Sequence, residues 1–405
     1  MGKCRQRAAG DYNMTFKPRS KVSRREALAM ASATFGTVAA MSVLGVPARA
    51  SGTSSSYSNR AIDVVDSSLV IDMLSVMAPI GAIYQMLSQD EPLDGFRLID
   101  AQVDLLLSMG IDVFHPAINV PGRDEALSFV ARMNAYAAER PETVYRIDDV
   151  EDFERVREPD KIGFIIGIQN SDHLRSVDDV NRFYFLGQRV GQLIYNNRNR
   201  LGSGGLERND GGLSHFGVQV VERMNEVGMA VDVSHGGDTT TLDACEVSQR
   251  PVFNTHTNAR ALNPGNPRCI TDEAIKAIAG TGGIVGVTGV RSFVRKTEPT
   301  NVSHIVDHID HIAELVGIEH VGVGSDIDPH GYDDLPEKFL TGTQGFFKRI
   351  YGFRGKLDTD GFDHPKRTYD LAEAMINRGY SDQHIRLVLG ENFRRALAVS
   401  WSKEQ

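Results

Sequence analysis

The sequence has few cysteines, no surplus of positive charge and, after its first fifty residues, no long apolar run. Its three cysteines in 405 residues lack the C-x-x-C spacing of a metal site. Cys4 lies near the start, and we expect Cys245 and Cys269 to be packing residues, the alternative being a disulfide. The 53 acidic residues outnumber the 44 basic ones and are interspersed with them, which argues against a nucleic-acid partner. No apolar segment beyond residue 50 is long enough to span a membrane.

The first fifty residues are typical of an export signal. The stretch "SRREAL" (23–28) precedes an Ala-rich, mildly apolar run, and "ARA" (48–50) is a small-x-small cleavage site. We expect a twin-arginine signal peptide over 1–50, a polar linker over 51–65, and a single periplasmic domain over 66–405. The alternative is an ordinary secretory signal in which the arginine pair is fortuitous.

Eight short apolar runs alternate with amphipathic helical stretches along the rest of the chain. Several helical stretches end on Gly just before the next run, as helix C-termini do. Continuous apolar strands that alternate with helices predict an α/β fold, here a parallel (β/α)8 TIM barrel. An open doubly wound sheet is the alternative, but no Gly-rich phosphate loop follows the first run. The runs cover residues 69–72, 111–118, 162–170, 191–196, 229–235, 251–256, 282–289 and 320–328.

Polar residues close these apolar runs. In a TIM barrel the active site lies at the C-terminal ends of the strands, so these residues predict a site at the barrel mouth. They are Asp72, His115, Gln169 with Asn170, Asn196, His235, His256, and Asp326 with Asp328.

His235 and His256 end consecutive strands, which would make their imidazoles neighbours. Imidazole is the commonest zinc ligand, so the pair predicts a metal or catalytic site; the alternative is two hydrogen-bonded structural histidines. Asp326 in "GVGSDID" is a candidate third ligand or general acid/base, unless it only caps the following loop. Arg268 in "NPGNPRCITDE" is a candidate for binding a substrate carboxylate, with surface solvation as the alternative.

A second histidine cluster, in "VSHIVDHIDHIAELVG", has the spacing of a helical metal motif. His304, His308 and His311 form one stripe, beside an apolar stripe that is expected to pack on the barrel. We therefore expect these histidines on the outer wall, far from the strand ends.

The chain from about residue 66 to the C-terminus resembles the membrane (renal) dipeptidase family, peptidase family M19. The stretch from "GLSHFGVQVVERMNEVGMAVDVSH" through "NTHTNARALNPGNPRCITDE", with "HVGVGSDID" and "RGYSDQHIRLVLGENFRRAL", carries the resemblance. It implies an amidohydrolase-type barrel with two zinc ions that hydrolyses dipeptides, including those with a C-terminal D-residue, and a homodimer. It further implies that His235 and His256 hold the second ion, that Arg268 binds the substrate carboxylate and that Asp326 handles the proton.

The sequence departs from that family where the first ion should bind. The family's first strand ends in Asp-x-His-x-Asp; here Asp72 remains, but Leu74 and Val76 replace the two ligands. Gln169 stands in place of the bridging Glu, and Asn196 or a neighbour in place of a substrate-contacting His. Since a neutral amide cannot neutralise two dications, these changes argue against a two-ion centre.

The resulting hypothesis is an exported hydrolase that cleaves a dipeptide or small amide with one zinc ion or none. Two alternatives remain: a metal-free tautomerase or isomerase in which the histidines, Asp72 and Asp326 act as acid and base, and a non-catalytic ligand-binding barrel. The predicted roles are metal binding by His235 and His256, catalysis by Asp326 and Asp72, and substrate binding by Arg268, Asn196 and Gln169.

Overall fold

The structure is a computed structural model that describes residues 57–75, 98–120, 122–332, 351–352 and 355–402. The predicted signal peptide over 1–50 lies outside these residues, as does Val76. No helix among them is long and apolar enough to cross a membrane.

The described strands are all parallel and form two hydrogen-bonded sheets. Their orders are β1-β2-β4-β3 and β10-β9-β8-β7-β6-β5. The bounds are β1 Ile71–Asp72, β2 Val113–Phe114, β3 Val144–Arg146, β4 Ile162–Phe164, β5 Ile166–Ile168, β6 Gln188–Gln192, β7 Ala230–Asp232, β8 Val252–Thr257, β9 Ile284–Val287 and β10 Val321–Val323.

The two sheets join at both edges and close a barrel. At one edge Ser75 bridges Ile327, and the backbone N–H of Met73 donates to Val323 at 2.9 Å. At the other edge β4 and β5 follow each other as one continuous barrel strand, and Ile118 bridges Ile168. The barrel therefore has eight strands, one for each predicted apolar run: β1, β2, the continuous pair β4–β5, and β6 to β10. The TIM-barrel prediction is confirmed, although β6 begins three residues earlier than its predicted run.

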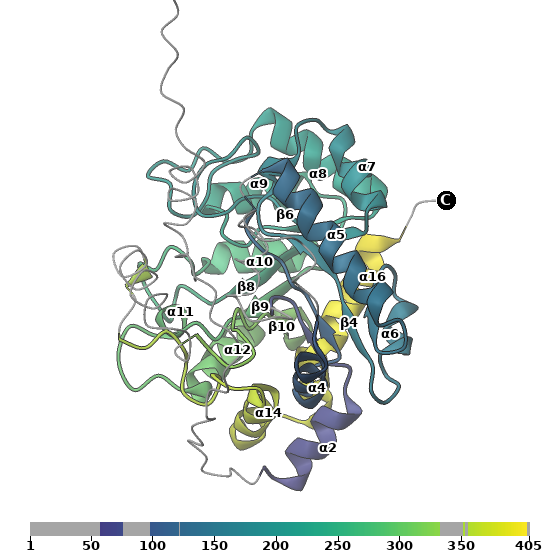
Figure 1. The fold of residues 1–405 in the computed structure, drawn as a ribbon. Coiled ribbons are helices and arrows are strands. Elements are labelled where there is room, and N and C mark those ends of the chain that lie inside the picture. Colours follow the sequence, from purple (N-terminus) through teal and green to yellow (C-terminus); the bar gives the residue numbers. More distant parts are fainter. Residues whose placement is uncertain (1–56, 76–97, 121, 333–350, 353–354, 403–405) are drawn as a thin grey trace, which may run out of the picture.

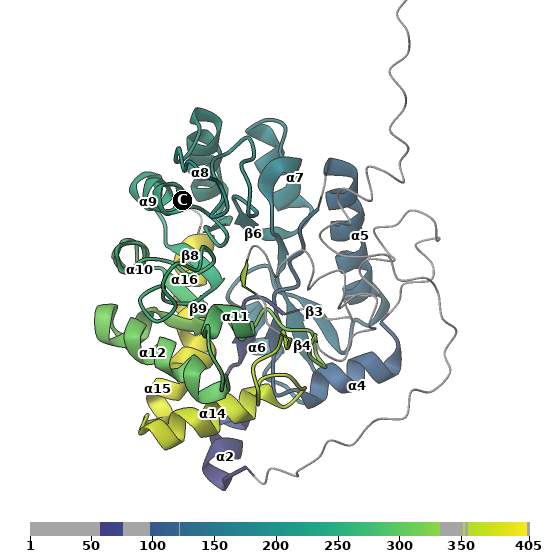
Figure 2. The ribbon, with the colours of Figure 1, turned by 90° about the vertical axis from the view of Figure 1, so that its left-hand side faces the viewer.

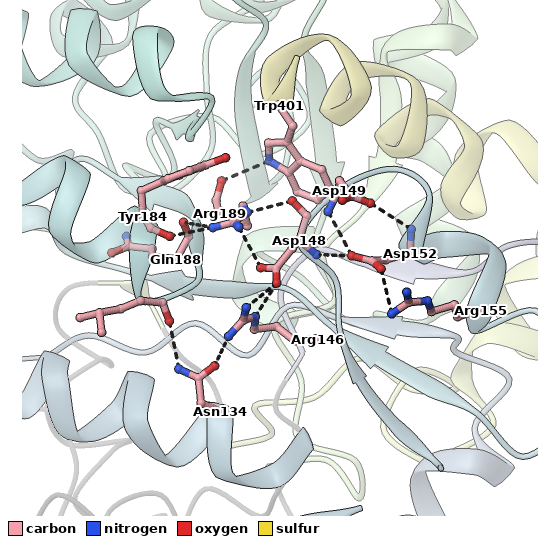
Figure 3. A network of polar contacts seen from close by, with 11 residues as sticks. Asn134, Arg146, Asp148, Asp149, Asp152, Arg155, Tyr184, Gln188, Arg189 and Trp401 are labelled. Carbon is pink, nitrogen blue, oxygen red and sulfur yellow. Dashed lines mark hydrogen bonds and ion pairs between the residues drawn. The ribbon is translucent and has the colours of Figure 1, made fainter. Parts of the chain in front are cut away.

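The extra strand β3 completes the wall where β4 and β6 are not paired. It lies beside β4, in the position that β6 takes beside β5. Arg189, at the start of β6, donates to the carbonyl of Asp148 at 2.8 Å and pairs with its carboxylate at 3.0 Å. Arg146 also pairs with Asp148, and Trp401 donates from its indole to the carbonyl of Arg189 (Figure 3). This network joins β3, β6 and the C-terminal helix into one seam.

Helices cover the outside of the barrel strands (Figure 1). In Figure 2 the helices α8, α9, α10, α12 and α14 follow one another around the barrel. The helix α2 begins within the predicted linker, 51–65, and continues into the predicted domain. The helical bounds are α2 Asn59–Ser67, α4 Asp100–Ser108, α5 Arg123–Glu139, α6 Asp152–Arg155, α7 Asp178–Phe185, α8 His215–Val227, α9 Asp238–Val247, α10 Asp272–Gly280, α11 Arg291–Val294, α12 Val302–Val316, α14 Arg367–Arg378, α15 Asp382–Arg386 and α16 Asn392–Trp401.

Local sequence signals set where several of these helices begin and end. Ser214 caps α8 by accepting from the Gly217 N–H at 3.0 Å, and Thr271 caps α10 in the same way. The helix α8 ends at Gly228, whose φ of 80° is left-handed and favours glycine.

An apolar layer fills one end of the barrel and leaves the polar residues to the other. Strand residues such as Ile71, Val190 and Phe253 pack there against Phe393 and Trp401 of α16. Since this floor is apolar, polar chemistry is restricted to the C-terminal ends of the strands.

Candidate active site

Three of the predicted site residues have a left-handed backbone three or four residues after their strands end. The φ angles are 57° at Asn196, 64° at His235 and 56° at Asp326. Such a conformation costs a non-glycine residue about 1–3 kcal/mol and is concentrated at functional sites, where the surrounding structure holds it. Among the described residues only Asp160, in the turn before β4, is another non-glycine with positive φ.

His235 and His256 are neighbours, as the sequence predicts. Their Nε2 atoms lie 3.0 Å apart, and both side chains are buried. The ring of Tyr195 stacks on His235 with the centroids 4.2 Å apart. Burial, followed by the positive charge of Arg268, lowers the pKa of both imidazoles well below its ordinary value, so both are neutral.

The hydrogen bonds at the other ring nitrogens define the tautomers. His235 Nδ1 lies 2.7 Å from Asn196 Oδ1, an acceptor, so His235 carries its proton on Nδ1. His256 Nδ1 lies 2.9 Å from Thr255 Oγ1, whose own proton goes to the Asp232 carboxylate at 2.7 Å. His256 must therefore also be the donor at Nδ1, and both Nε2 atoms present lone pairs to each other.

The carboxylate of Asp232 supports this arrangement by accepting four hydrogen bonds. Asp232 Oδ1 accepts from Ser234 N, Ser234 Oγ and Thr255 N at 2.9, 2.6 and 3.1 Å, in addition to the Thr255 hydroxyl on Oδ2. Sequence analysis missed this support, although an acid two residues before Ser234 in an apolar strand was a usable signal.

Arg268 lies beside the histidine pair. It is buried, donates from one guanidinium nitrogen to the carbonyl of His256 at 3.1 Å and lies over the Phe293 ring at 5.2 Å. Its Nε has no hydrogen-bond partner in the described part of the chain. A buried guanidinium with an open N–H fits the predicted binding of a carboxylate and argues against the solvation alternative.

Asp326 has the electrostatics of a proton carrier. Burial, together with the negative charge of Asp72 and against the positive charge of Arg268, raises the pKa of Asp326 to about 7. A carboxyl group half-protonated at neutral pH can both accept and return a proton. The left-handed backbone of Asp326 is held by its N–H, which donates to the carbonyl of Leu74 at 2.7 Å.

The carboxylate of Asp72, a predicted catalytic residue, is held by backbone N–H groups and by an arginine. Its Oδ1 accepts from the backbone N–H of Ser325 at 2.7 Å and of Leu74 at 3.2 Å. Its Oδ2 lies 3.6 Å from the guanidinium of Arg367, which is buried and also donates to Ser75 Oγ at 2.8 Å. Burial raises the pKa of Asp72, and the charge of Arg367 opposes the shift. These contacts tie β1 to the turn after β10 and favour a structural role for this carboxylate.

The two predicted substrate-binding amides lie in different surroundings. Gln169 follows β5, and its Nε2 donates to the carbonyl of Ala117 at 2.8 Å. Asn196 follows β6, and its Oδ1 accepts from both His235 and the hydroxyl of Tyr351. Asn196 is therefore joined to the histidine pair, whereas Gln169 faces the end of β2. Tyr351 was missed because it comes from a distant part of the chain.

His115 is a further buried polar residue of the barrel interior. Its Nδ1 donates to the carbonyl of Met73 at 2.6 Å, and its buried Nε2 has no partner among the described residues. A Cβ on Gly167 would lie 1.8 Å from that nitrogen, so β5 approaches the ring as closely as only glycine allows.

His235 and His256 could together supply two ligands to a metal ion. The facing Nε2 lone pairs are the donor set of half a tetrahedral zinc site. Leu74, which the family resemblance aligns with a first-ion ligand, is buried and has no donor atom. Within the described ranges no three His, Cys, Asp or Glu side chains gather as a metal site.

The histidines of α12 have separate structural contacts. His308 is buried, accepts at Nδ1 from the Ala259 N–H at 3.2 Å and donates from Nε2 to the carbonyl of Val294 at 2.9 Å. His311 pairs with Asp272 at 2.8 Å. These histidines lie on an outer helix as expected, but His308 is not far from the strand ends, because it bonds Ala259 two residues after β8 and so supports the loop that carries Arg268.

The two cysteines of the domain are free thiols. Burial raises the pKa of both Cys245 and Cys269 to about 12, and Cys269 donates to the carbonyl of Phe293 at 3.3 Å. These contacts agree with the expected packing role.

The parallel barrel, with paired histidines, an aspartate and an arginine at its strand ends, defines an amidohydrolase-type protein. The model of the membrane dipeptidase family, peptidase family M19, matches residues 74–339. The chain belongs to this family of dipeptidase-type hydrolases, as its sequence resemblance indicates.

Individual relatives agree with this assignment. The uncharacterized dipeptidase C965.12 of Schizosaccharomyces pombe is 32% identical over 215 residues, which are 48% of this chain and 51% of the relative. The chain spans about half the length of the curated relatives it matches. A solved amidohydrolase from Pseudomonas aeruginosa has a TM-score of 0.70 and 25% identity, covering 84% of this chain and 99% of its own. A metallo peptidase from Rhodobacter sphaeroides, liganded with a phosphinate mimic of L-Ala-D-Ala, has a TM-score of 0.66 and 19% identity, covering 82% and 99%, and shows the shared fold.

Proposed function

We propose that this protein hydrolyses a dipeptide or small amide that carries a carboxylate, with one metal ion held by His235 and His256. The observation that carries the proposal is the 3.0 Å distance between the Nε2 atoms of His235 and His256 at the mouth of an M19-family barrel. Two acceptors at this distance repel each other unless a cation lies between them. A zinc ion there would supply Lewis acidity to the amide carbonyl.

The chain's own residues would bind the substrate and move the proton. Arg268 would hold the substrate carboxylate through its guanidinium, whose Nε–H is open, and so place the amide beside the histidines. Asp326 would take the proton of the attacking water as the carbon–oxygen bond forms. It would return that proton to the leaving amine as the carbon–nitrogen bond breaks, giving an acid and an amine.

The substrate class follows from the arginine and from the family. The Rhodobacter sphaeroides relative holds a mimic of a dipeptide with a C-terminal D-residue. We extend that class to this chain because Arg268 lies where a terminal carboxylate can be bound. L-Ala-D-Ala is therefore the first substrate to assay.

The test combines metal content and dipeptide hydrolysis on one sample purified without chelator. We expect about one zinc per chain and measurable hydrolysis, both lost in His235→Ala, whereas His311→Ala on α12 keeps both. Protein that stays metal-free and inert after zinc is added would refute the proposal.

A second candidate is a metal-free proton-transfer enzyme, such as a tautomerase or isomerase. The Nε2 atoms of the two neutral imidazoles can accept a proton during turnover, and the pKa of Asp326 near 7 suits an acid/base. Turnover that survives exhaustive chelation would favour this candidate. Binding of a ligand without any turnover would favour the non-catalytic barrel.

We also propose export to the periplasm and assembly as a homodimer, from the signal-like segment and the family resemblance. Replacement of Arg24 and Arg25 by Lys should retain the protein in the cytoplasm if the twin-arginine route is used. Light scattering on the purified protein should give twice the chain mass.

A further inference from the structure

Tyr351 reaches the histidine pair from the far end of the chain. It lies between β10 and α14 in sequence, yet its hydroxyl donates to Asn196 Oδ1, after β6, at 2.5 Å. The side chain is buried, and its ring meets Phe293 edge-on with the centroids 5.2 Å apart. Burial raises the pKa of Tyr351 well above its ordinary value, so the hydroxyl keeps the proton that it donates.

Asn196 Oδ1 receives two donors at once. One is the Tyr351 hydroxyl and the other is His235 Nδ1, at 2.7 Å. The two lone pairs of one amide oxygen accommodate both. Because a phenol is a better donor than acceptor, Tyr351 favours the amide orientation that points oxygen, and not the NH2 group, at His235.

The opposite orientation of the Asn196 amide would place a proton on His235 Nε2 and so block cation binding there. With the Asn196 NH2 group toward His235, Nδ1 would be the acceptor and the proton would move to Nε2. That proton would then fill the 3.0 Å gap as a hydrogen bond to His256, and the lone pair of His235 would no longer be available to a cation.

We propose that Tyr351 is a positioning residue, which acts through Asn196 to fix His235 in the Nδ1–H tautomer and keep its Nε2 open toward His256. The proposal concerns the tautomer and therefore holds for either candidate function. It also explains why a residue so far along the chain is buried against a strand end on the opposite side of the barrel.

The test measures the tautomer directly in chelator-treated protein. Long-range 15N–1H NMR of 15N-histidine-labelled protein separates the two tautomers, and a His235→Gln sample assigns the signal. We expect the Nδ1–H form in the wild type and an Nε2–H or mixed form in Tyr351→Phe. Zinc affinity, measured by competition with a chromophoric chelator, should fall about tenfold in that variant. The matched control is Tyr369→Phe, whose hydroxyl bonds Asp66 on the outer wall.

A rescue variant separates positioning from simple loss of packing. Asp in place of Asn196 offers an acceptor oxygen in either orientation, so Asn196→Asp added to Tyr351→Phe should restore the Nδ1–H tautomer and most of the zinc affinity. A wild-type His235 with its proton on Nε2 would overturn the proposal. An unchanged tautomer in Tyr351→Phe, or a double variant in which the Nε2–H form persists, would overturn it equally.

Discussion

His235 Nε2 and His256 Nε2 face each other at 3.0 Å, each with its lone pair forward because its Nδ1 donates elsewhere. Two neutral imidazoles in this arrangement repel each other while the gap is empty, and together they attract a cation. The relationship ties the chemistry of the site to whatever positive species occupies the gap, whether a metal ion or a proton.

The pKa of Asp326 predicts the pH dependence of turnover. As a base it must be ionised, so kcat/KM should rise with pH through about 7 and level off above it. Asp326→Asn removes the base, and we expect a loss of about 10²–10⁴-fold in kcat. Steady-state kinetics from pH 5.5 to 9 would measure both, with the exposed Asp63→Asn as the control. A flat profile for the wild type would contradict the assignment of Asp326.

Arg268 should determine affinity for the substrate carboxylate. Arg268→Lys keeps the charge but loses the planar fork, so KM for a dipeptide should rise about 10–100-fold with kcat less affected. The matched control is the C-terminally amidated dipeptide, for which wild type and variant should differ little. An equal loss on both substrates would mean that Arg268 acts on the histidines instead of the carboxylate.

Buried neutral histidines should make the protein less stable in acid. Burial lowers the pKa of both His173 and His308 to about 4, below the ordinary value near 6.5. The unfolded state therefore binds more protons between pH 4 and 6.5, and the stability present above 6.5 is lost as the pH falls. Each histidine should contribute about 1–3 kcal/mol to the drop in unfolding free energy.

Urea unfolding at pH 7 and pH 4.5 measures this drop. His308→Gln should be less stable at pH 7 but should show a shallower fall toward acid. His384→Gln, at an exposed site, should keep the wild-type slope. A His308→Gln slope equal to that of the wild type would show that His308 does not titrate as described.

The seam between β3 and β6 should be important for stability. Arg189→Met keeps the aliphatic stem but leaves Asp148 without its partner at the start of β6, and we expect a loss of about 2–4 kcal/mol. The exposed pair of Arg60 and Asp382 offers the control, since Arg60→Met should cost no more than about 1 kcal/mol. Equal effects of the two variants would mean that the seam does not help to hold the barrel closed.

The sequence by itself determined the barrel and the residues at its mouth. Apolar runs that alternate with amphipathic helices allow few folds, because each continuous apolar strand must be buried on both faces. The helical stretch "VSHIVDHIDHIAELVG" (302–317) coincides with α12 almost residue for residue. The strand-end rule then placed Asn196, His235, His256 and Asp326 without any knowledge of distances.

Only the tertiary structure decided what those residues can do. Tautomers depend on which acceptor lies beside each ring nitrogen. The acceptor for His235 is Asn196, after another strand, and the acceptor for His256 is the neighbouring Thr255, whose own proton is taken by Asp232 of β7. Tyr351 and Arg367 reach the mouth from segments whose local patterns give no sign of it, because burial against a distant strand leaves no periodicity in sequence. Asp72 illustrates the difference: its position was predictable, but its engagement with Ser325 and Arg367 depends on contacts between segments more than 250 residues apart.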